Sequence, residues 1–178
     1  METDRRLEHE VAVSLDAAGT ILVFDYFGSH QRVLSDLLKQ HPDYEVVLFA
    51  TRNHPDLSRH SVFEILQNRN PLYVLTNDIP ARIIPTTARV QGMSHGDVVE
   101  LPFGGLTVRA YSAEDNAIAF TVNVASTGET VFYGEALPGP SLTLLSEQTP
   151  KIDIAFTPPE AQPALAGKVE VKEFVDIR

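Results

Sequence analysis

Residues 44–57 read Tyr-Glu-Val-Val-Leu-Phe-Ala-Thr-Arg-Asn-His-Pro-Asp-Leu, and the run changes from apolar to polar at Thr51. The apolar part predicts a buried strand over Tyr44–Ala50, because a strand covered on both faces is apolar at almost every position. The polar part predicts a loop. A loop that follows a buried strand is a place where a rigid scaffold presents ligands. This loop and the residues just after it hold three candidates, His54, Asp56 and His60.

On the N-terminal side of this stretch, two β-rich runs predict a hairpin. The runs are His9–Leu15 and Thr20–Phe27, and the short connection Asp16-Ala-Ala-Gly separates them. The second run is almost continuously apolar, which again favours a strand that is covered on both faces. Between it and Tyr44, the leucines of Val33–Gln40 fall on one face of a helix.

On the C-terminal side, we expect a helix from about Ser58 to Asn68 and a strand over Leu72–Leu75. From Asp97 onward the pattern changes to hairpins. The expected pairs are Val98–Leu101 with Leu106–Tyr111 and Ala117–Val124 with Thr130–Tyr133, followed by a short helix over Ser141–Ser146 and a strand over Ile152–Phe156. Hairpins do not make a purely parallel sheet, which needs a crossover after every strand. The predicted fold class is therefore α/β (α+β), with two mixed sheets and outer helices in one domain over residues 1–178.

The amino-acid composition argues against several classes of binding partner and indicates a cellular compartment. With 14 Lys and Arg against 24 Asp and Glu, the net charge is −10, which disfavours a nucleic-acid partner. The chain has no cysteine, so disulfides and thiolate metal ligands are excluded. No apolar run approaches the roughly 20 residues of a membrane span, and the first residues do not resemble a secretory signal. We therefore expect no membrane association and a cytoplasmic protein.

Several segments, taken in order, carry a resemblance to a known family. Besides the loop after Ala50, they are Phe-Asp-Tyr at 24–26, Val-Leu-Thr-Asn-Asp-Ile at 74–79, Ala-Glu-Asp-Asn-Ala-Ile-Ala-Phe at 113–120, Thr-Val-Phe-Tyr-Gly-Glu-Ala at 130–136 and Ile-Asp-Ile-Ala-Phe at 152–156. In order and spacing they resemble the metallo-β-lactamase superfamily, in particular its small single-domain branch. The resemblance implies a four-layer αββα sandwich of two mixed sheets, with a metal site at the loop.

The loop departs from the pattern of that family, which is Thr/Ser-His-x-His-x-Asp-His. Aligned without gaps, Thr51 takes the first position and Arg52 stands where the first metal-binding His belongs. His54 matches the second His and Asp56 matches the Asp. Leu57 stands where the last His belongs. Two of the four ligands in this motif are thus replaced.

The remaining ligand positions are changed as well. The carboxylate that bridges the metal ions in the family aligns with Ala136, or with Glu135 if the alignment slips by one residue, and a later Pro-x-Asp becomes Pro-Pro-Glu at 158–160. Arg52 places a permanent positive charge where a divalent cation would lie. If Asp56 is buried it needs a partner, and Arg52 is the one we expect.

The resemblance and the replacements together predict a degenerate protein, non-catalytic or much weakened, that binds a small molecule or a protein partner, with a homo-oligomer among the expected states and no cofactor. His54, Asp56 and Glu135 would then be vestiges of the metal site. One alternative is a single-metal hydrolase of an ester or phosphoester, in which His54 and Asp56 hold zinc or another divalent metal and Asp56 is catalytic. A second is a haloacid-dehalogenase-like phosphatase with Asp16 as nucleophile, which the hairpins disfavour.

Several candidate residues also have simpler, structural interpretations. His60 is expected on a helix face, and His9 and His95 in loops or in solvent. Asp25, at the end of an expected strand, is expected to cap the following turn, as carboxylates often do. Glu135 also fits a plain turn residue.

Overall fold

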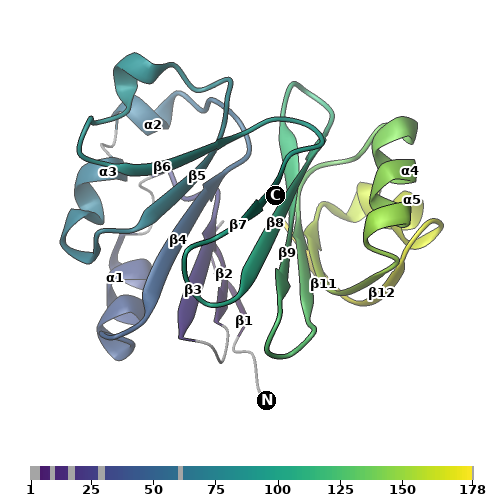
Figure 1. The fold of residues 1–178 in the computed structure, drawn as a ribbon, viewed down its shortest axis with the longest axis horizontal. Coiled ribbons are helices and arrows are strands. Elements are labelled where there is room, and N and C mark those ends of the chain that lie inside the picture. The colour runs from purple at the N-terminus through teal and green to yellow at the C-terminus, as the bar shows by residue number, and fades with distance from the viewer. Residues whose placement is uncertain (1–4, 9–10, 16–18, 28–30, 60–61, 178) are drawn as a thin grey trace. The chain divides into compact units, whose positions relative to one another are not determined.

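The computed structural model describes residues 5–8, 11–15, 19–27, 31–59 and 62–177. The chain divides into two compact units, residues 1–92 and 93–178, and a six-stranded sheet is the basis of each (Figure 1). Both sheets contain parallel and antiparallel pairs, so the predicted two mixed sheets are confirmed. The expectation that residues 1–178 form one domain stays a prediction.

The first sheet has its strands in chain order, β1 (Arg5–Glu8), β2 (Val11–Leu15), β3 (Thr20–Phe24), β4 (Glu45–Ala50), β5 (Leu72–Thr76) and β6 (Arg89–Met93). β2 and β3 pair antiparallel, which confirms the predicted hairpin, although residues 16–18 of its connection lie outside the described residues. β3, β4 and β5 pair parallel. On these three strands the side chains of both faces are buried, as their apolar runs predicted.

The helices of this unit are α1 (Gln31–Gln40), α2 (Asp56–Arg59), α3 (Val62–Ile65) and two 3-10 turns, η1 (Gln67–Arg69) and η2 (Ala81–Ile83). Within the described residues, the helix expected from about Ser58 to Asn68 covers the end of α2, α3 and η1; residues 60–61 lie outside them, and residues 67–69 form a 3-10 turn rather than α-helix. Leu57 and the group Val62, Phe63 and Leu66 all pack into the same core.

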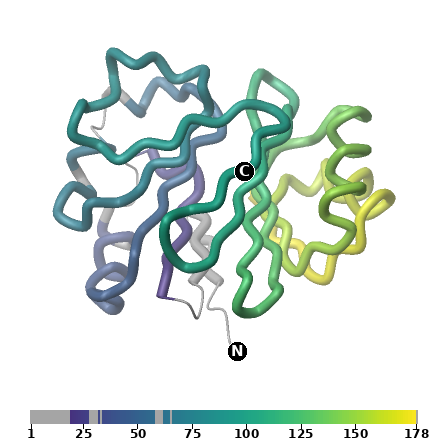
Figure 2. The backbone as a smooth tube through the Cα atoms, viewed as in Figure 1, coloured from purple at the N-terminus to yellow at the C-terminus, as the bar shows by residue number. Residues whose placement is uncertain are grey.

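The second sheet has the order β12 (Glu170–Asp176), β11 (Lys151–Thr157), β10 (Thr130–Tyr133), β9 (Ile118–Val124), β8 (Leu106–Ser112) and β7 (Val98–Glu100). The β7–β8 and β9–β10 hairpins are the two that the sequence predicts. α4 (Gly139–Gln148), η3 (Pro159–Ala161) and α5 (Gln162–Ala166) follow these hairpins, and Figure 2 traces the backbone from β10 through α4 to β12. Leu142, Leu145 and Leu165 of these helices form a core with the sheet residues Tyr111 and Phe132.

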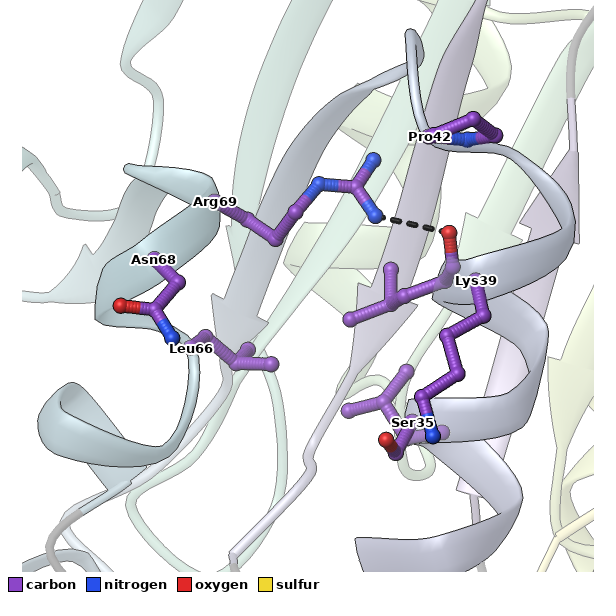
Figure 3. Close-up of a pocket in the computed structure, with 8 residues that line it drawn as sticks. Ser35, Lys39, Pro42, Leu66, Asn68 and Arg69 are labelled. Carbon is purple, nitrogen blue, oxygen red and sulfur yellow. Dashed lines mark hydrogen bonds between the residues drawn. The ribbon is translucent and has the colours of Figure 1, made fainter.

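Arg69 ties the end of α1 to the strand that follows it. Its guanidinium donates hydrogen bonds to the carbonyl oxygens of Leu38, His41 and Tyr44, each at 2.8 Å. Figure 3 shows the side chain reaching across a pocket of about 520 Å³, with Leu66 on one side and Ser35 and Lys39 of α1 on the other. The Leu38 carbonyl, in the last turn of α1, and the His41 carbonyl each also accept a backbone N–H, from His41 and Tyr44, so Arg69 reinforces the turns that lead out of the helix.

We expect Arg69→Met to lower the free energy of unfolding by roughly 2–4 kcal/mol, because three hydrogen bonds from a charged donor are lost while most of the apolar stem remains. Urea unfolding followed by circular dichroism measures the change. Arg82→Met is the matched control, since Arg82 is exposed on η2. Equal unfolding midpoints for the two variants would contradict the role assigned to Arg69.

Candidate functional site

Asp25 links the ends of two neighbouring strands. It directly follows β3 and has a left-handed backbone, with φ of 49°, which Asp tolerates better than most residues. Its N–H donates to the carbonyl of Phe49 at 2.8 Å. Its carboxylate accepts the N–H of Thr51 at 2.8 Å and the Thr51 hydroxyl at 2.6 Å. We expected a cap of the turn after β3, whereas these contacts of Asp25 hold the chain that leaves β4.

Thr51, only 2% exposed, is thus the fixed first residue of the candidate loop. From there, the His54 N–H donates to the Arg52 carbonyl at 3.1 Å, and the Leu57 N–H donates to the His54 carbonyl at 3.1 Å. These turns send the two replaced ligand positions in different directions. Arg52 is exposed to solvent, and Leu57 is 1% exposed within the hydrophobic core.

His54 and Asp56 are brought together at the start of α2. The imidazole of His54 stacks on the ring of Phe27, with centroids 4.3 Å apart and an interplanar angle of 8°. The Asp56 N–H donates to Nδ1 of His54 at 3.1 Å, whereas the Asp56 carboxylate lies 3.7 Å from the same nitrogen. The shorter contact has hydrogen-bond geometry and the longer one does not, so Nδ1 acts as an acceptor and the ring proton belongs on Nε2.

This arrangement does not fit a two-metal centre. A metal-bound imidazole keeps its proton on the nitrogen that faces away from the metal, and in His54 that nitrogen, Nδ1, already faces an N–H donor. Leu57 has no ligand atom, and Arg52 is a cation. Within the described residues, no group of three or more His, Cys, Asp or Glu is placed to hold a metal ion. His60 lies outside these residues.

The expected partner of Asp56 differs as well. We predicted that Arg52 pairs with a buried Asp56, but the Asp56 side chain is 34% exposed and lies beside His54. In the described part of the chain, no ion pair joins Arg52 to Asp56. As the first residue of α2, Asp56 is favourably placed near the positive end of the helix dipole, although a helix of four residues makes this effect small.

The other candidate carboxylates lie in the second unit. Glu135, partly buried, follows Gly134 at the end of β10. A Cβ added to Gly134 would lie 2.3 Å from the Cβ of Ala119, so only glycine fits there. Glu160, at the later ligand position, is exposed on η3.

The remaining predicted residues have simple roles or fall outside the description. His95 is exposed, and its Nδ1 accepts the N–H of Ser112 at 2.8 Å. His9 and Asp16 lie outside the described residues. The strand after Asp16 pairs antiparallel with the strand before it, whereas a haloacid-dehalogenase-like fold needs a helical crossover at this point. Sequence reasoning missed the ring stacking on Phe27, for which the only signal was an aromatic residue at the end of an apolar run.

Solved structures resemble this chain, although no family profile and no curated protein sequence matches it. Igni18, a novel metallo hydrolase from the archaeon Ignicoccus hospitalis, aligns over 95% of this chain and 78% of its own, with 15% identity and a TM-score of 0.69. The metallo-β-lactamase fold protein YhfI from Bacillus subtilis aligns over 94% and 77%, with 14% identity and a TM-score of 0.62. Human tRNase Z, short form, aligns over 94% and 84%, with 13% identity and a TM-score of 0.55.

These likenesses extend over both units, and they show that the chain has the metallo-β-lactamase fold. The α/β fold class implied by the sequence motifs is thereby confirmed. At identities of 13–15%, the likeness concerns the fold alone. No helix formed by the described residues is both long and apolar enough to cross a membrane.

The Asp25–Thr51 contact predicts a specific stability effect. Thr51→Val should lower the free energy of unfolding by about 1.5–3 kcal/mol, because it leaves one carboxylate oxygen of Asp25 without its hydroxyl donor. Thr51→Ser keeps the hydroxyl and should lose less. Thermal and urea unfolding of the three proteins provide the comparison. If the valine variant is as stable as the serine variant, the hydroxyl contact does not stabilise the loop.

Arg52, unlike Thr51, is exposed, so we expect its substitution to have little effect on the free energy of unfolding. Arg52→Ala should change the free energy of unfolding by less than about 0.5 kcal/mol, as surface substitutions usually do. The same unfolding experiments measure it. A loss of several times that size would show that Arg52 supports the fold through Asp56, as the charge balance of the sequence first suggested.

Proposed function

We propose that this chain is a non-catalytic protein of the metallo-β-lactamase fold, which acts by binding a small ligand or a protein partner. The observation that carries the proposal is the position of Leu57. Where the family pattern has a metal-binding imidazole, this side chain is 1% exposed and packs with Val62 and Phe63 in the core. A residue in this position supports the packing of α2 and α3, and it has no atom that can coordinate a metal.

The electrostatics of the loop support the same conclusion. Metal-dependent hydrolysis needs several neutral imidazoles and carboxylates around one cation, with an open position for water. Here the first ligand position carries the guanidinium of Arg52, and the second, His54, uses Nδ1 to accept the Asp56 N–H. Both residues retained from the motif thus have local structural roles. His54 ends the turn before α2, and Asp56 begins the helix.

A single-metal hydrolase is the second candidate, and one observation favours it. The side chains of His54 and Asp56 are 27% and 34% exposed and lie next to each other, so solvent reaches both. For His54 to bind a metal through Nε2, its ring would have to give up the hydrogen bond from Asp56 or lose its remaining proton. This cost makes the second candidate the weaker of the two.

Metal content and hydrolytic activity separate the two candidates. After chelator treatment, we expect the untagged protein to retain no stoichiometric zinc, iron or manganese when each metal is added back, as measured by elemental analysis. It should also show no metal-dependent hydrolysis of ester and phosphoester substrates. The reason is that the loop offers too few free ligand atoms for a metal to bind stably.

His54→Ala, Asp56→Ala and the control His95→Ala complete the experiment. Under the proposal, all three variants match the parent in metal content and in background hydrolysis. If one metal returns per chain and is lost in His54→Ala and Asp56→Ala but not in His95→Ala, the single-metal hydrolase is correct and the proposal is wrong.

A further inference from the structure

A polar pocket of about 280 Å³ lies within the second unit. The residues that line it come from four neighbouring strands, β8 to β11, and from the end of α4 with the segment that follows it; the main ones are Thr107, Arg109, Thr121, Asn123, Thr130 and Lys151. The volume is close to the lower end of the range for small-ligand sites, which begins near about 300 Å³.

Strand alternation and the length of α4 explain why the pocket exists. Thr107, Arg109 and Tyr111 alternate along β8 and therefore share one face of the sheet. Tyr111 is fully buried in the core beneath α4. The helix ends at Gln148, and the chain turns into β11. Beyond the end of α4, the face of the sheet that the helix covers is therefore polar. It carries Thr107 and Arg109 on β8 and their cross-strand partners Asn123 and Thr121 on β9.

The two charged residues that line the pocket, Arg109 and Lys151, are both cations. In the part of the chain that the structure describes, neither side chain forms an ion pair or a hydrogen bond. The chain as a whole has a net charge of −10. A pocket lined by two cations without a counterion therefore has the opposite charge to the chain as a whole. The carboxylate of Asp153 accepts the Thr130 N–H at 2.8 Å, and Asp153 is not a lining residue.

Hydroxyl groups complete the lining, and their positions are fixed. Thr121, Thr130 and Thr149 are 2%, 6% and 8% exposed, so packing holds their side chains. The Asn123 amide donates to the Thr130 hydroxyl oxygen at 3.0 Å, which leaves the hydrogen of that hydroxyl to be donated. At the edge of the pocket, the Tyr111 hydroxyl donates to Gln148 at 2.9 Å. Burial raises the pKa of this phenol, and the hydroxyls of Thr149 and Thr121 form hydrogen bonds to its oxygen. Among these three threonines, Thr130 is therefore the one whose hydroxyl hydrogen is left for a ligand.

We propose that this pocket binds a small tetrahedral oxyanion, the phosphate group of a metabolite or free phosphate. The guanidinium of Arg109 offers paired N–H donors that match such an anion, the ammonium of Lys151 adds charge, and the Thr130 hydroxyl adds a further donor. The site lies where β10 and β11 begin, whereas Glu135 and Glu160 follow the opposite ends of these strands.

Equilibrium dialysis with radiolabelled inorganic phosphate tests the proposal on the full chain, in sodium chloride of constant ionic strength. We expect one phosphate per chain, with binding about tenfold weaker in Arg109→Gln and severalfold weaker in Lys151→Gln. Thr130→Val should weaken binding about threefold through one lost hydroxyl donor. Unlabelled sulfate should displace the phosphate, and acetate at the same concentration should not.

Two control variants each remove one positive charge at a position outside the pocket. Arg82→Gln matches Arg109→Gln, and Lys168→Gln matches Lys151→Gln; both control residues are exposed and outside the pocket. Circular dichroism and thermal unfolding show whether each variant is folded. Phosphate binding that falls equally in test and control variants, or displacement by acetate as effective as by sulfate, would overturn the proposal. So would the absence of saturable binding by the folded parent. Release of a phosphomonoester from the purified protein on unfolding would identify a metabolite rather than free phosphate as the source.

Discussion

The carboxylate of Asp25 joins the ends of two parallel strands, and the course of the candidate loop depends on this junction. Both donors of Thr51, its N–H and its hydroxyl, point to that carboxylate. The chain therefore leaves β4 in one direction, and six residues later it places Leu57 in the core. Such a contact needs a backbone with positive φ at residue 25, which Asp allows and most other side chains resist.

With the loop held in this way, the motif residues have become part of the structure. His54 packs flat on Phe27 and accepts the N–H that begins α2, and Leu57 anchors the same helix from within the core. Each of these contacts uses an atom or a position that a metal centre would need. The loop thus serves packing, and the two cations that line the polar pocket, Arg109 and Lys151, lie in the second unit.

The strands that sequence reasoning located were those with a clear pattern, either apolar throughout, as in 45–50, or paired across a Gly-containing turn, as in 118–133. The strands it missed are β1, β6 and β12. β1 and β12 lie at the edges of their sheets, and the residues of β12 are mostly exposed or half-buried, so no burial requirement imposes a regular pattern on them. In the region expected as one helix over 58–68, the described departure is the 3-10 turn η1, which apolar periodicity does not distinguish from the last turn of an α-helix.

By itself, the sequence determined the α/β class, the two mixed sheets and the replacement of two ligand positions, because these follow from residue types and their order. It also identified Asp25, His54 and Asp56 as residues worth attention. Only the tertiary structure decided what each of them contacts. The Asp25–Thr51 bonds join positions 26 residues apart, and the Arg109 pocket joins four strands to the end of a helix. Local pattern cannot specify such contacts, since they depend on strand register and on where a helix ends.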